Sequence, residues 1–368
     1  MQTRFRLEKC RPAGERETIG WFCSYTQEEL IAAAGFAPVR LSSGERPTES
    51  AEAYLPASFC PYVRSLLGAA LSGGAEGLRG VVFVASCDAM RRLVDIWTLY
   101  VGSRFSFRLD LPRRREHLAE EFLIRQLESL RSALGKEAGR PVGDDDIAEA
   151  IATANQTRGL VARFSALRSE GKVSGPEFFA IARGAMSADG QLFNAEAERF
   201  LAAVESEGRE PASSGGGPRL LLCGGVADGP VMELLIEESG GDVVADDLCS
   251  ASRHFDGLVD ESLEPLRGLA RRYLQRAPCA RMAGAGERVR RLLELASGAE
   301  VDGVVYHSLK FCDLVQSDLP RVRAALEEVG IPLLHVDRDY SAAESGQLKT
   351  RVEAFVEMLG DGNRRSKR

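Results

Sequence analysis

The chain has 368 residues, 44% of them hydrophobic, and a formal net charge of −7. Its length exceeds that of an ordinary single domain and its composition is typical of globular proteins, so we expect two or three domains. The acidic balance argues against nucleic acid as a partner. No apolar run reaches the roughly 18 residues needed to cross a bilayer, and the N-terminus lacks the apolar core of a signal peptide. We therefore expect a cytoplasmic protein without a membrane partner.

The first α/β domain is predicted at residues 20–112, after a polar lead-in at 1–19. Its expected strands lie at 20–25, 37–41, 80–88 and 105–111, and its expected helices at 27–34, 61–71 and 90–100. Pro61 suits the first position of a helix, which places Cys60 at a helix N-terminus, where a thiol pKa is lowered. The strand G-V-V-F-V-A-S-C-D ends in Cys87 and Asp88.

A helical subdomain is predicted at residues 113–209, which are charged and carry helical periodicity. Its expected helices lie at 115–138, 145–168, 175–186 and 192–207. We interpret Arg113-Arg114-Arg115 as a helix surface rather than an anion site.

A linker rich in Gly and Ser, residues 210–218, leads to a second α/β domain at 219–362 and a basic tail at 363–368. The expected strands lie at 219–223, 242–245, 301–306 and 331–336, alternating with helices at 230–239, 263–276, 286–297, 319–329 and 346–360. This alternation predicts a parallel, doubly wound sheet. Gly224-Gly225 matches neither nucleotide-binding glycine pattern, so we expect a plain turn and no ATP site.

The stretch V-D-G-V-V-Y-H-S-L-K-F-C-D at residues 301–313 is the centre of this organisation. Its apolar, β-branched run predicts a strand buried on both faces. His307, Lys310 and Cys312 are expected beyond its carboxyl end, where ligands bind in open α/β sheets. Together with Cys87, Cys312 suggests two similar α/β halves facing one site.

Eight cysteines are more than packing requires in a cytosolic chain, where disulfides are disfavoured. They are Cys10, Cys23, Cys60, Cys87, Cys223, Cys249, Cys279 and Cys312. None forms a C-x-x-C pair, which argues against a zinc ribbon. Dispersed loop cysteines suit a metal cluster assembled by tertiary folding, although a buried free thiol is the default interpretation of any single one.

Several motifs together resemble the 2-hydroxyacyl-CoA dehydratase / benzoyl-CoA reductase D-component family, over about residues 20–359. They are F-C-S-Y-T-Q-E-E-L-I-A-A-A-G-F-A-P-V-R at 22–40, C-P-Y-V-R-S at 60–65, S-C-D-A-M-R-R-L at 86–93, D-D-L-C-S-A-S-R at 246–253, Y-H-S-L-K-F-C-D at 306–313, and D-R-D-Y with G-Q-L-K-T-R-V-E-A-F at 337–355. One departure is Gln27, where the family usually has Pro.

The resemblance implies two Rossmann-like domains, each a doubly wound parallel sheet, with a helical region between them. It also implies a [4Fe-4S] cluster held by Cys60, Cys87 and Cys312. Such enzymes receive single electrons from an ATP-hydrolysing iron–sulfur activator and form a ketyl radical from an acyl-CoA. They act as dimers, which here means either a homodimer or a heterodimer with a paralogous subunit.

Two alternatives stay open. A related branch carries an [8Fe-9S] double cubane and reduces small molecules, and its extra ligands would be Cys23, Cys249 and Cys279. The neighbouring Asp246 and Asp247 would disfavour a thiolate at Cys249, and Arg253 would offset them. The other alternative is an iron–sulfur electron-transfer subunit without turnover of its own. Cys10 and Cys223 fit ordinary thiols in both cases.

Glu29, Ser24 and His307 are the candidate catalytic residues, because each is expected at or just beyond a strand end that faces the cluster. Two structural interpretations compete with this hypothesis. Glu29 could cap its own helix, and His307 could be a buried structural histidine.

Overall fold

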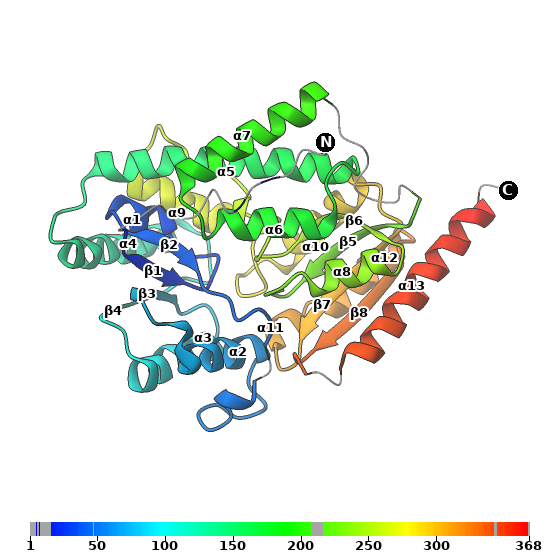
Figure 1. Ribbon diagram of the computed structural model, residues 1–368, viewed down its shortest axis with the longest axis horizontal. Coiled ribbons are helices and arrows are strands. Elements are labelled where there is room, and N and C mark those ends of the chain that lie inside the picture. The colour runs from blue at the N-terminus through cyan, green and yellow to red at the C-terminus, as the bar shows by residue number, and fades with distance from the viewer. Residues whose placement is uncertain are drawn as a thin grey trace.

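Two four-stranded parallel sheets form the framework of the computed structural model, which describes residues 5, 7, 16–46, 48–207, 216–341 and 344–366 (Figure 1). The first sheet has the order β2-β1-β3-β4 and comprises Thr18–Trp21 (β1), Ala37–Arg40 (β2), Leu78–Val84 (β3) and Phe105–Leu109 (β4). The second has the order β6-β5-β7-β8 and comprises Arg219–Gly224 (β5), Asp242–Asp247 (β6), Gly303–Leu309 (β7) and Leu333–Arg338 (β8). The predicted fold class is therefore confirmed.

Both sheets are buried on both faces, as the uninterrupted apolar runs of their central strands require. In β3, Val81 and Phe83 belong to one hydrophobic core, and Val82 and Val84 belong to another. The strands of the second sheet alternate in the same way between two cores. Successive side chains of a strand point to opposite faces, so helices must cover each side.

The helices of the first α/β region are Glu28–Ala33 (α1), Pro61–Ala69 (α2) and Asp88–Ile96 (α3). The short helical segments of this region are Glu49–Ala51 (η2), Ala70–Gly74 (η3) and Trp97–Val101 (η4). In the second region they are Val231–Glu238 (α8), Ser252–Phe255 (η5), Pro265–Gln275 (α9), Ala285–Gly298 (α10), Asp313–Gln316 (α11), Leu319–Glu328 (α12) and Glu344–Ser366 (α13). None of the helices in the described ranges is both long and apolar enough to cross a membrane.

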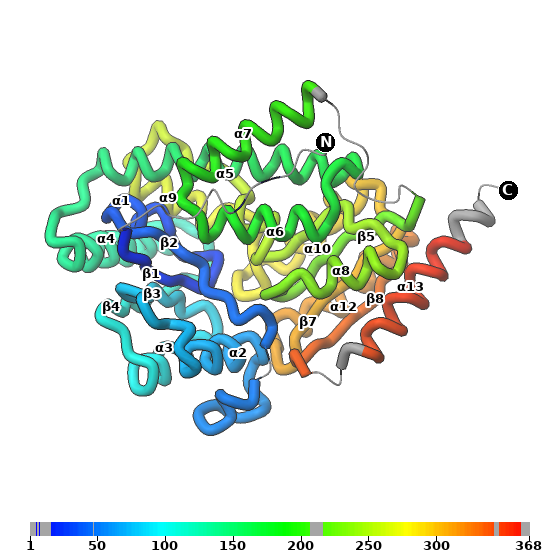
Figure 2. Tube along the Cα trace, in the orientation of Figure 1, coloured from blue at the N-terminus to red at the C-terminus, as the bar shows by residue number. Residues whose placement is uncertain are grey.

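The helical segment comprises His117–Ala138 (α4), Asp144–Ser169 (α5), Gly175–Ala185 (α6) and Gly190–Glu207 (α7). It packs against both sheets: α5 contacts α1 and β6, and α4 contacts β4 and α9. Figure 2 shows the chain passing from the first sheet through this segment to the second. The domain boundaries proposed from the sequence stay predictions. Most of the lead-in, linker residues 210–215 and the last two tail residues lie outside the described residues.

The main differences from the predicted elements lie at strand ends. β1 ends at Trp21, so residues 22–27 form a loop that carries Cys23 and Ser24. β7 continues to Leu309, so the expectation that His307 lies beyond the strand is wrong. The reason is that β7 lies between two partners and His307 pairs with Gly224 of β5 and Val336 of β8.

A segment after β2 joins the two sheet regions. Ser43 donates to the Asp228 carboxylate from its backbone N–H (2.6 Å) and from its hydroxyl (2.7 Å). Glu45 accepts from the backbone N–H groups of Asp228 and Gly229, both at 3.1 Å, and forms a buried ion pair with Arg338 at 2.8 Å. We call these contacts the Glu45 clamp.

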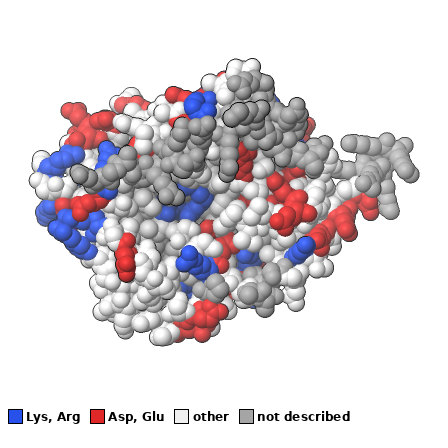
Figure 3. Space-filling model, viewed as in Figure 1, with Lys and Arg blue, Asp and Glu red and all other residues white. Residues whose placement is uncertain are grey.

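On the face shown in Figure 3, acidic side chains predominate along α13 and basic ones at the left edge.

Candidate metal centre

Four cysteines follow the carboxyl ends of parallel strands. Cys23 follows β1 and Cys87 follows β3, the adjacent strands at which the order of the first sheet reverses. In the second sheet, Cys249 follows β6 and Cys312 follows β7. The region beyond such a reversal is where open α/β sheets bind ligands.

Cys60, Cys87 and Cys312, the first thiol group, each occupy the position immediately before a helix: α2, α3 and α11. The Met90 N–H donates to the Cys87 sulfur at 3.5 Å. Burial, followed by the nearby Cys312 thiol, raises the pKa of Cys60 to about 12, and burial raises that of Cys312 to about 11. Backbone N–H groups act in the opposite direction on all three thiols.

Cys23, Cys249 and Cys279, the second thiol group, lie beside the first. Burial, followed by Cys279, raises the pKa of Cys23 to about 11, and Cys249 contributes in the same direction. The Arg281 N–H donates to the Cys279 sulfur at 3.3 Å. Cys87 interacts electrostatically with Cys279, and Cys312 interacts with Cys249. The fold therefore gathers six thiols at one place.

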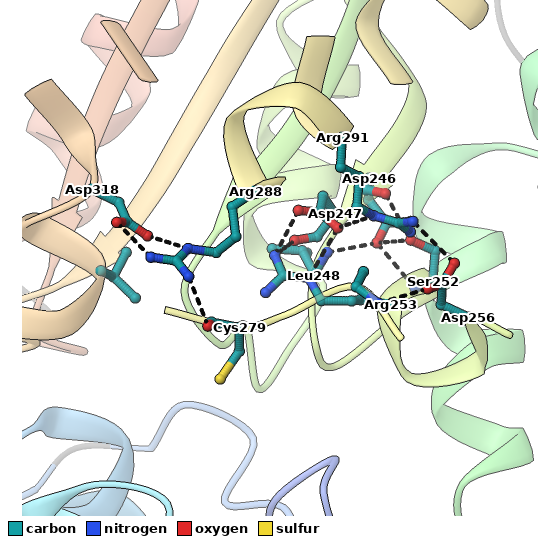
Figure 4. A network of polar contacts seen from close by, with 12 residues as sticks. Asp246, Asp247, Leu248, Ser252, Arg253, Asp256, Cys279, Arg288, Arg291 and Asp318 are labelled. Atoms are coloured by element: carbon teal, nitrogen blue, oxygen red, sulfur yellow. Dashed lines mark hydrogen bonds and ion pairs between the residues drawn. The ribbon is translucent and has the colours of Figure 1, made fainter. Parts of the chain in front are cut away.

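The carboxylates next to Cys249 are fully engaged by arginines (Figure 4). Asp247 accepts from Arg253 at 2.9 and 2.8 Å and from Arg291 at 3.1 Å. Asp246 accepts from Arg168 at 2.7 Å. Their negative charge is thus balanced locally, which removes much of the expected conflict with a thiolate at Cys249. In Figure 4 the Cys279 sulfur points away from this network, toward the N-terminal region.

The donor set of the described residues is not arranged around a single metal ion. In the part of the chain that the structure describes, no three His, Cys, Asp or Glu side chains are placed to hold one metal ion. In a cubane each thiolate binds a different iron, so its ligands lie further apart than those of one ion. Buried thiols that raise one another's pKa are unfavourable as thiolates until a metal supplies positive charge.

Cys223 lies apart from this arrangement. It is buried within β5, and its pKa is raised by burial and then by Asp247, as expected of an ordinary core thiol. Cys10 lies outside the described residues.

The three candidate catalytic residues are buried and do not converge on one point. The Glu29 carboxylate accepts from Arg158 and, at 3.0 Å, from the Tyr273 hydroxyl. Ser24 accepts from Arg276, at 2.7 Å through its carbonyl and 3.0 Å through its hydroxyl. Their catalytic roles stay predictions.

His307 is fully buried, and neither ring nitrogen has a hydrogen-bond partner among the described residues. Burial, followed by the charge of Arg338, lowers its pKa to about 3. The ring is therefore neutral near pH 7, and its catalytic role stays a prediction.

A cavity of about 250 Å³ lies between α1 and α5, and Glu28, Glu29, Thr157, Arg158 and Phe255 are among its lining residues. A larger depression of about 750 Å³, lined by residues such as Phe36, Arg79 and Leu192, involves none of the six thiols.

Several buried polar groups near the thiols are not predicted from the sequence. The Tyr62 and Tyr340 hydroxyls have no partner among the described residues, and Tyr62 interacts electrostatically with Cys249. Tyr62 stands two positions after Cys60, and Arg281 stands two positions after Cys279. The signal that could reveal Tyr62 and Arg281 in the sequence is their position, two residues after a candidate cysteine ligand.

Comparisons with known proteins show the family of the chain. The sequence matches the family described as 2-hydroxyglutaryl-CoA dehydratase, D-component, over residues 23–359. It is 26% identical to the (R)-phenyllactyl-CoA dehydratase beta subunit of Clostridium sporogenes, covering 94% of this chain and 92% of the relative. It is 25% identical to a subunit of benzoyl-CoA reductase from Thauera aromatica (94% and 91%) and 23% identical to the (R)-2-hydroxyglutaryl-CoA dehydratase beta subunit of Acidaminococcus fermentans (96% and 95%). The chain therefore belongs to the 2-hydroxyglutaryl-CoA dehydratase D-component family.

Proposed function

We propose that this chain is an iron–sulfur subunit of an acyl-CoA dehydratase or reductase that receives low-potential electrons from an ATP-dependent activator. The observation that carries the proposal is the placement of Cys60, Cys87 and Cys312 immediately before three helices, with Cys87 beyond the end of β3 in the first sheet and Cys312 beyond the end of β7 in the second. The relatives support the substrate class, since they are named as subunits acting on acyl-CoA thioesters. Their subunit names also support assembly with a second copy or a paralogous chain.

The three thiols of the first group would hold a [4Fe-4S] cluster, which would supply single low-potential electrons to a thioester carbonyl. The backbone N–H groups and the apolar side chains around these thiols have different roles. Backbone N–H groups hydrogen-bond to the ligand sulfurs and favour the thiolate form. The neighbouring apolar core, which includes Phe22, Tyr62 and Trp97, keeps bulk water from one side of the site.

Iron binding tests this proposal directly. We expect Cys87→Ala and Cys312→Ala to lose most of the iron and visible absorbance of the anaerobically purified protein, because ligand thiolates are integral to the cluster. Cys223→Ala is the matched control, since its thiol lies in the core of β5. Undiminished iron in either ligand variant would contradict the proposal.

A second candidate function is favoured by the six gathered thiols: a double-cubane [8Fe-9S] reductase of small molecules. Cys23, Cys249 and Cys279 adjoin the first group, as a second cubane requires. The iron content then approaches about eight atoms per chain, and Cys249→Ser removes much of it. About four iron atoms in both wild type and Cys249→Ser would exclude the double cubane and leave the single-cubane enzyme.

Activator-dependent turnover separates both enzymes from a pure electron-transfer subunit. The measurement is turnover of an acyl-CoA or of a small-molecule substrate by this chain with the activator and ATP, compared with the same mixture lacking this chain. Equal rates would assign it no catalytic contribution.

A further inference from the structure

Three buried arginines near the thiols lack a carboxylate partner. Arg40, Arg276 and Arg281 are only 3%, 5% and 8% exposed. Within the described ranges, none of them forms an ion pair with Asp or Glu, and the Nε–H of each has no hydrogen-bond acceptor. A buried guanidinium in this state is costly, because it has lost hydration without gaining a compensating charge.

The hydrogen bonds that these arginines do form go to neutral atoms. Arg40 donates to the Cys249 carbonyl at 2.7 Å and to the Met186 sulfur at 3.2 Å. Arg281 donates to the Leu111 carbonyl at 3.2 Å. Arg276 donates to the Ser24 carbonyl and hydroxyl and to the His254 carbonyl. None of these contacts neutralises a positive charge.

Acidic groups in the vicinity are outnumbered by arginines. Glu28 lies in the electrostatic range of four of them, Arg40, Arg158, Arg272 and Arg276. Asp228 lies near Arg40 and also forms an ion pair with Arg183 at 3.6 Å. An excess of positive charge therefore remains near the thiols.

Each arginine lies in the electrostatic range of thiols. Arg40 interacts with Cys23 and Cys249, and Arg281 interacts with Cys279 and Cys87. Arg276 interacts with Cys279. The two thiol groups are thus approached by positive charge on more than one side. An iron–sulfur cluster ligated by thiolates carries negative charge, and its net charge and surroundings set its reduction potential.

We propose that Arg40, Arg276 and Arg281 are a built-in counter-charge for the cluster, which they retain and whose reduction potential they raise. The inference rests on the proposed iron–sulfur function. Reduction adds one electron to an already anionic group, so fixed positive charge nearby stabilises the reduced form. The arginines are positioning residues that act through the cluster.

Arg281 offers the cleanest test, because its single side-chain hydrogen bond makes it the least involved in folding. We expect Arg281→Gln to shift the midpoint potential of the bound cluster to more negative values and to lower iron retention. Arg281→Lys, which keeps the charge, should restore both. The measurement is a potentiometric titration followed by electron paramagnetic resonance on the anaerobic full-length protein.

Arg288→Gln is the matched control. Arg288 holds the same loop through the carbonyls of Cys279 (3.3 Å) and Met282 (2.8 Å), but its charge is paired with Asp318 at 2.6 and 2.8 Å (Figure 4). A shift in Arg288→Gln as large as that in Arg281→Gln would assign the effect to loop disturbance and overturn the proposal. An unchanged potential in Arg281→Gln at equal iron content would overturn it as well.

The iron-free protein supplies a second readout. Without the anionic cluster Arg281 is an uncompensated buried charge, so Arg281→Gln should raise the urea midpoint of the iron-free protein, while Arg281→Lys should not. A lowered midpoint in iron-free Arg281→Gln would refute the counter-charge. Wild-type protein that binds no iron would refute the proposed function, and the inference with it; a loaded cluster with unchanged potential would refute the inference alone.

Discussion

Glu29 shows how one residue can satisfy a catalytic pattern and a structural one. It stands in the loop-to-helix region where the sequence predicts a cleft residue. The structure places its carboxylate between Arg158 and Tyr273, with both side chains of the ion pair almost fully buried. An acid held in this way joins α1 to α5 and α9, which are far apart in the sequence.

We expect Glu29→Gln to lower the free energy of unfolding by about 3 kcal/mol, because it leaves the Arg158 guanidinium buried without its counter-ion. Urea unfolding of the iron-free protein measures this. Glu205→Gln is the control, since the Arg163–Glu205 pair is largely exposed and should contribute less than about 1 kcal/mol. An unchanged unfolding free energy in Glu29→Gln would argue for a catalytic role, to be tested by turnover at equal iron content.

At the scale of elements, the end of β5 requires a glycine at one of the two positions of Gly224-Gly225, and the sequence alone does not show which. The sequence predicts a plain turn at Gly224-Gly225. Gly224 has a φ of +113°, and a Cβ at this position would lie 2.1 Å from the His307 carbonyl oxygen of the adjacent strand. At Gly225 a Cβ would meet its nearest atom at an ordinary 3.5 Å. The first glycine is required by close approach and by conformation, and the second is not.

Gly224→Ala should therefore destabilise the protein by about 3 kcal/mol or more, through backbone strain and displacement of β7. Gly225→Ala should change stability by less than about 1 kcal/mol. Thermal unfolding of the two variants side by side measures the difference. Equal melting temperatures would show that β5 and β7 can separate without cost.

Much of the element order could be predicted from the sequence, and the reasons are local. The central strands are apolar on both faces, and the four helices of residues 117–207 carry long amphipathic periods. Strand ends were predicted less well. The last residues of β7 remain in the sheet because β8 extends alongside them, and this pairing partner is not visible in the sequence of β7 itself.

The sequence predicted which thiols the fold brings together, but not which groups surround them. Cysteines at strand ends and before Pro61 carry a recognisable pattern. The pairing of Asp246 with Arg168 and of Asp247 with Arg291 joins residues that are 78 and 44 positions apart. Such pairs depend on how separate elements dock, so local patterns do not reveal them.

At the scale of the whole molecule, the Glu45 clamp fixes one sheet region against the other. One carboxylate accepts from two backbone N–H groups and from Arg338, and it is almost entirely buried. The thiols lie beyond the strand ends of both regions, so we expect the clamp to influence how accessible they are. The contacts of the clamp join residues of the two sheet regions, so they position these regions relative to each other and add little to either hydrophobic core.

We expect Glu45→Gln to increase, several-fold, the rate at which a thiol reagent labels Cys60 and Cys87 in the iron-free protein, because a weakened clamp lets the two halves separate more often. Mass spectrometry of the labelled peptides measures these rates. Glu52→Gln is the control, since Glu52 is half-exposed and pairs with Arg64 within the first region. Identical rates in Glu45→Gln and wild type would show that the clamp does not govern access.

The spread of the six thiols along the chain has a consequence for biosynthesis. Their positions run from 23 to 312. At roughly 5–20 residues per second on a ribosome, the first thiol waits many seconds for the last one to emerge. Iron delivered during that interval would meet isolated sulfurs, so we expect the proposed cluster to assemble only after the chain has folded.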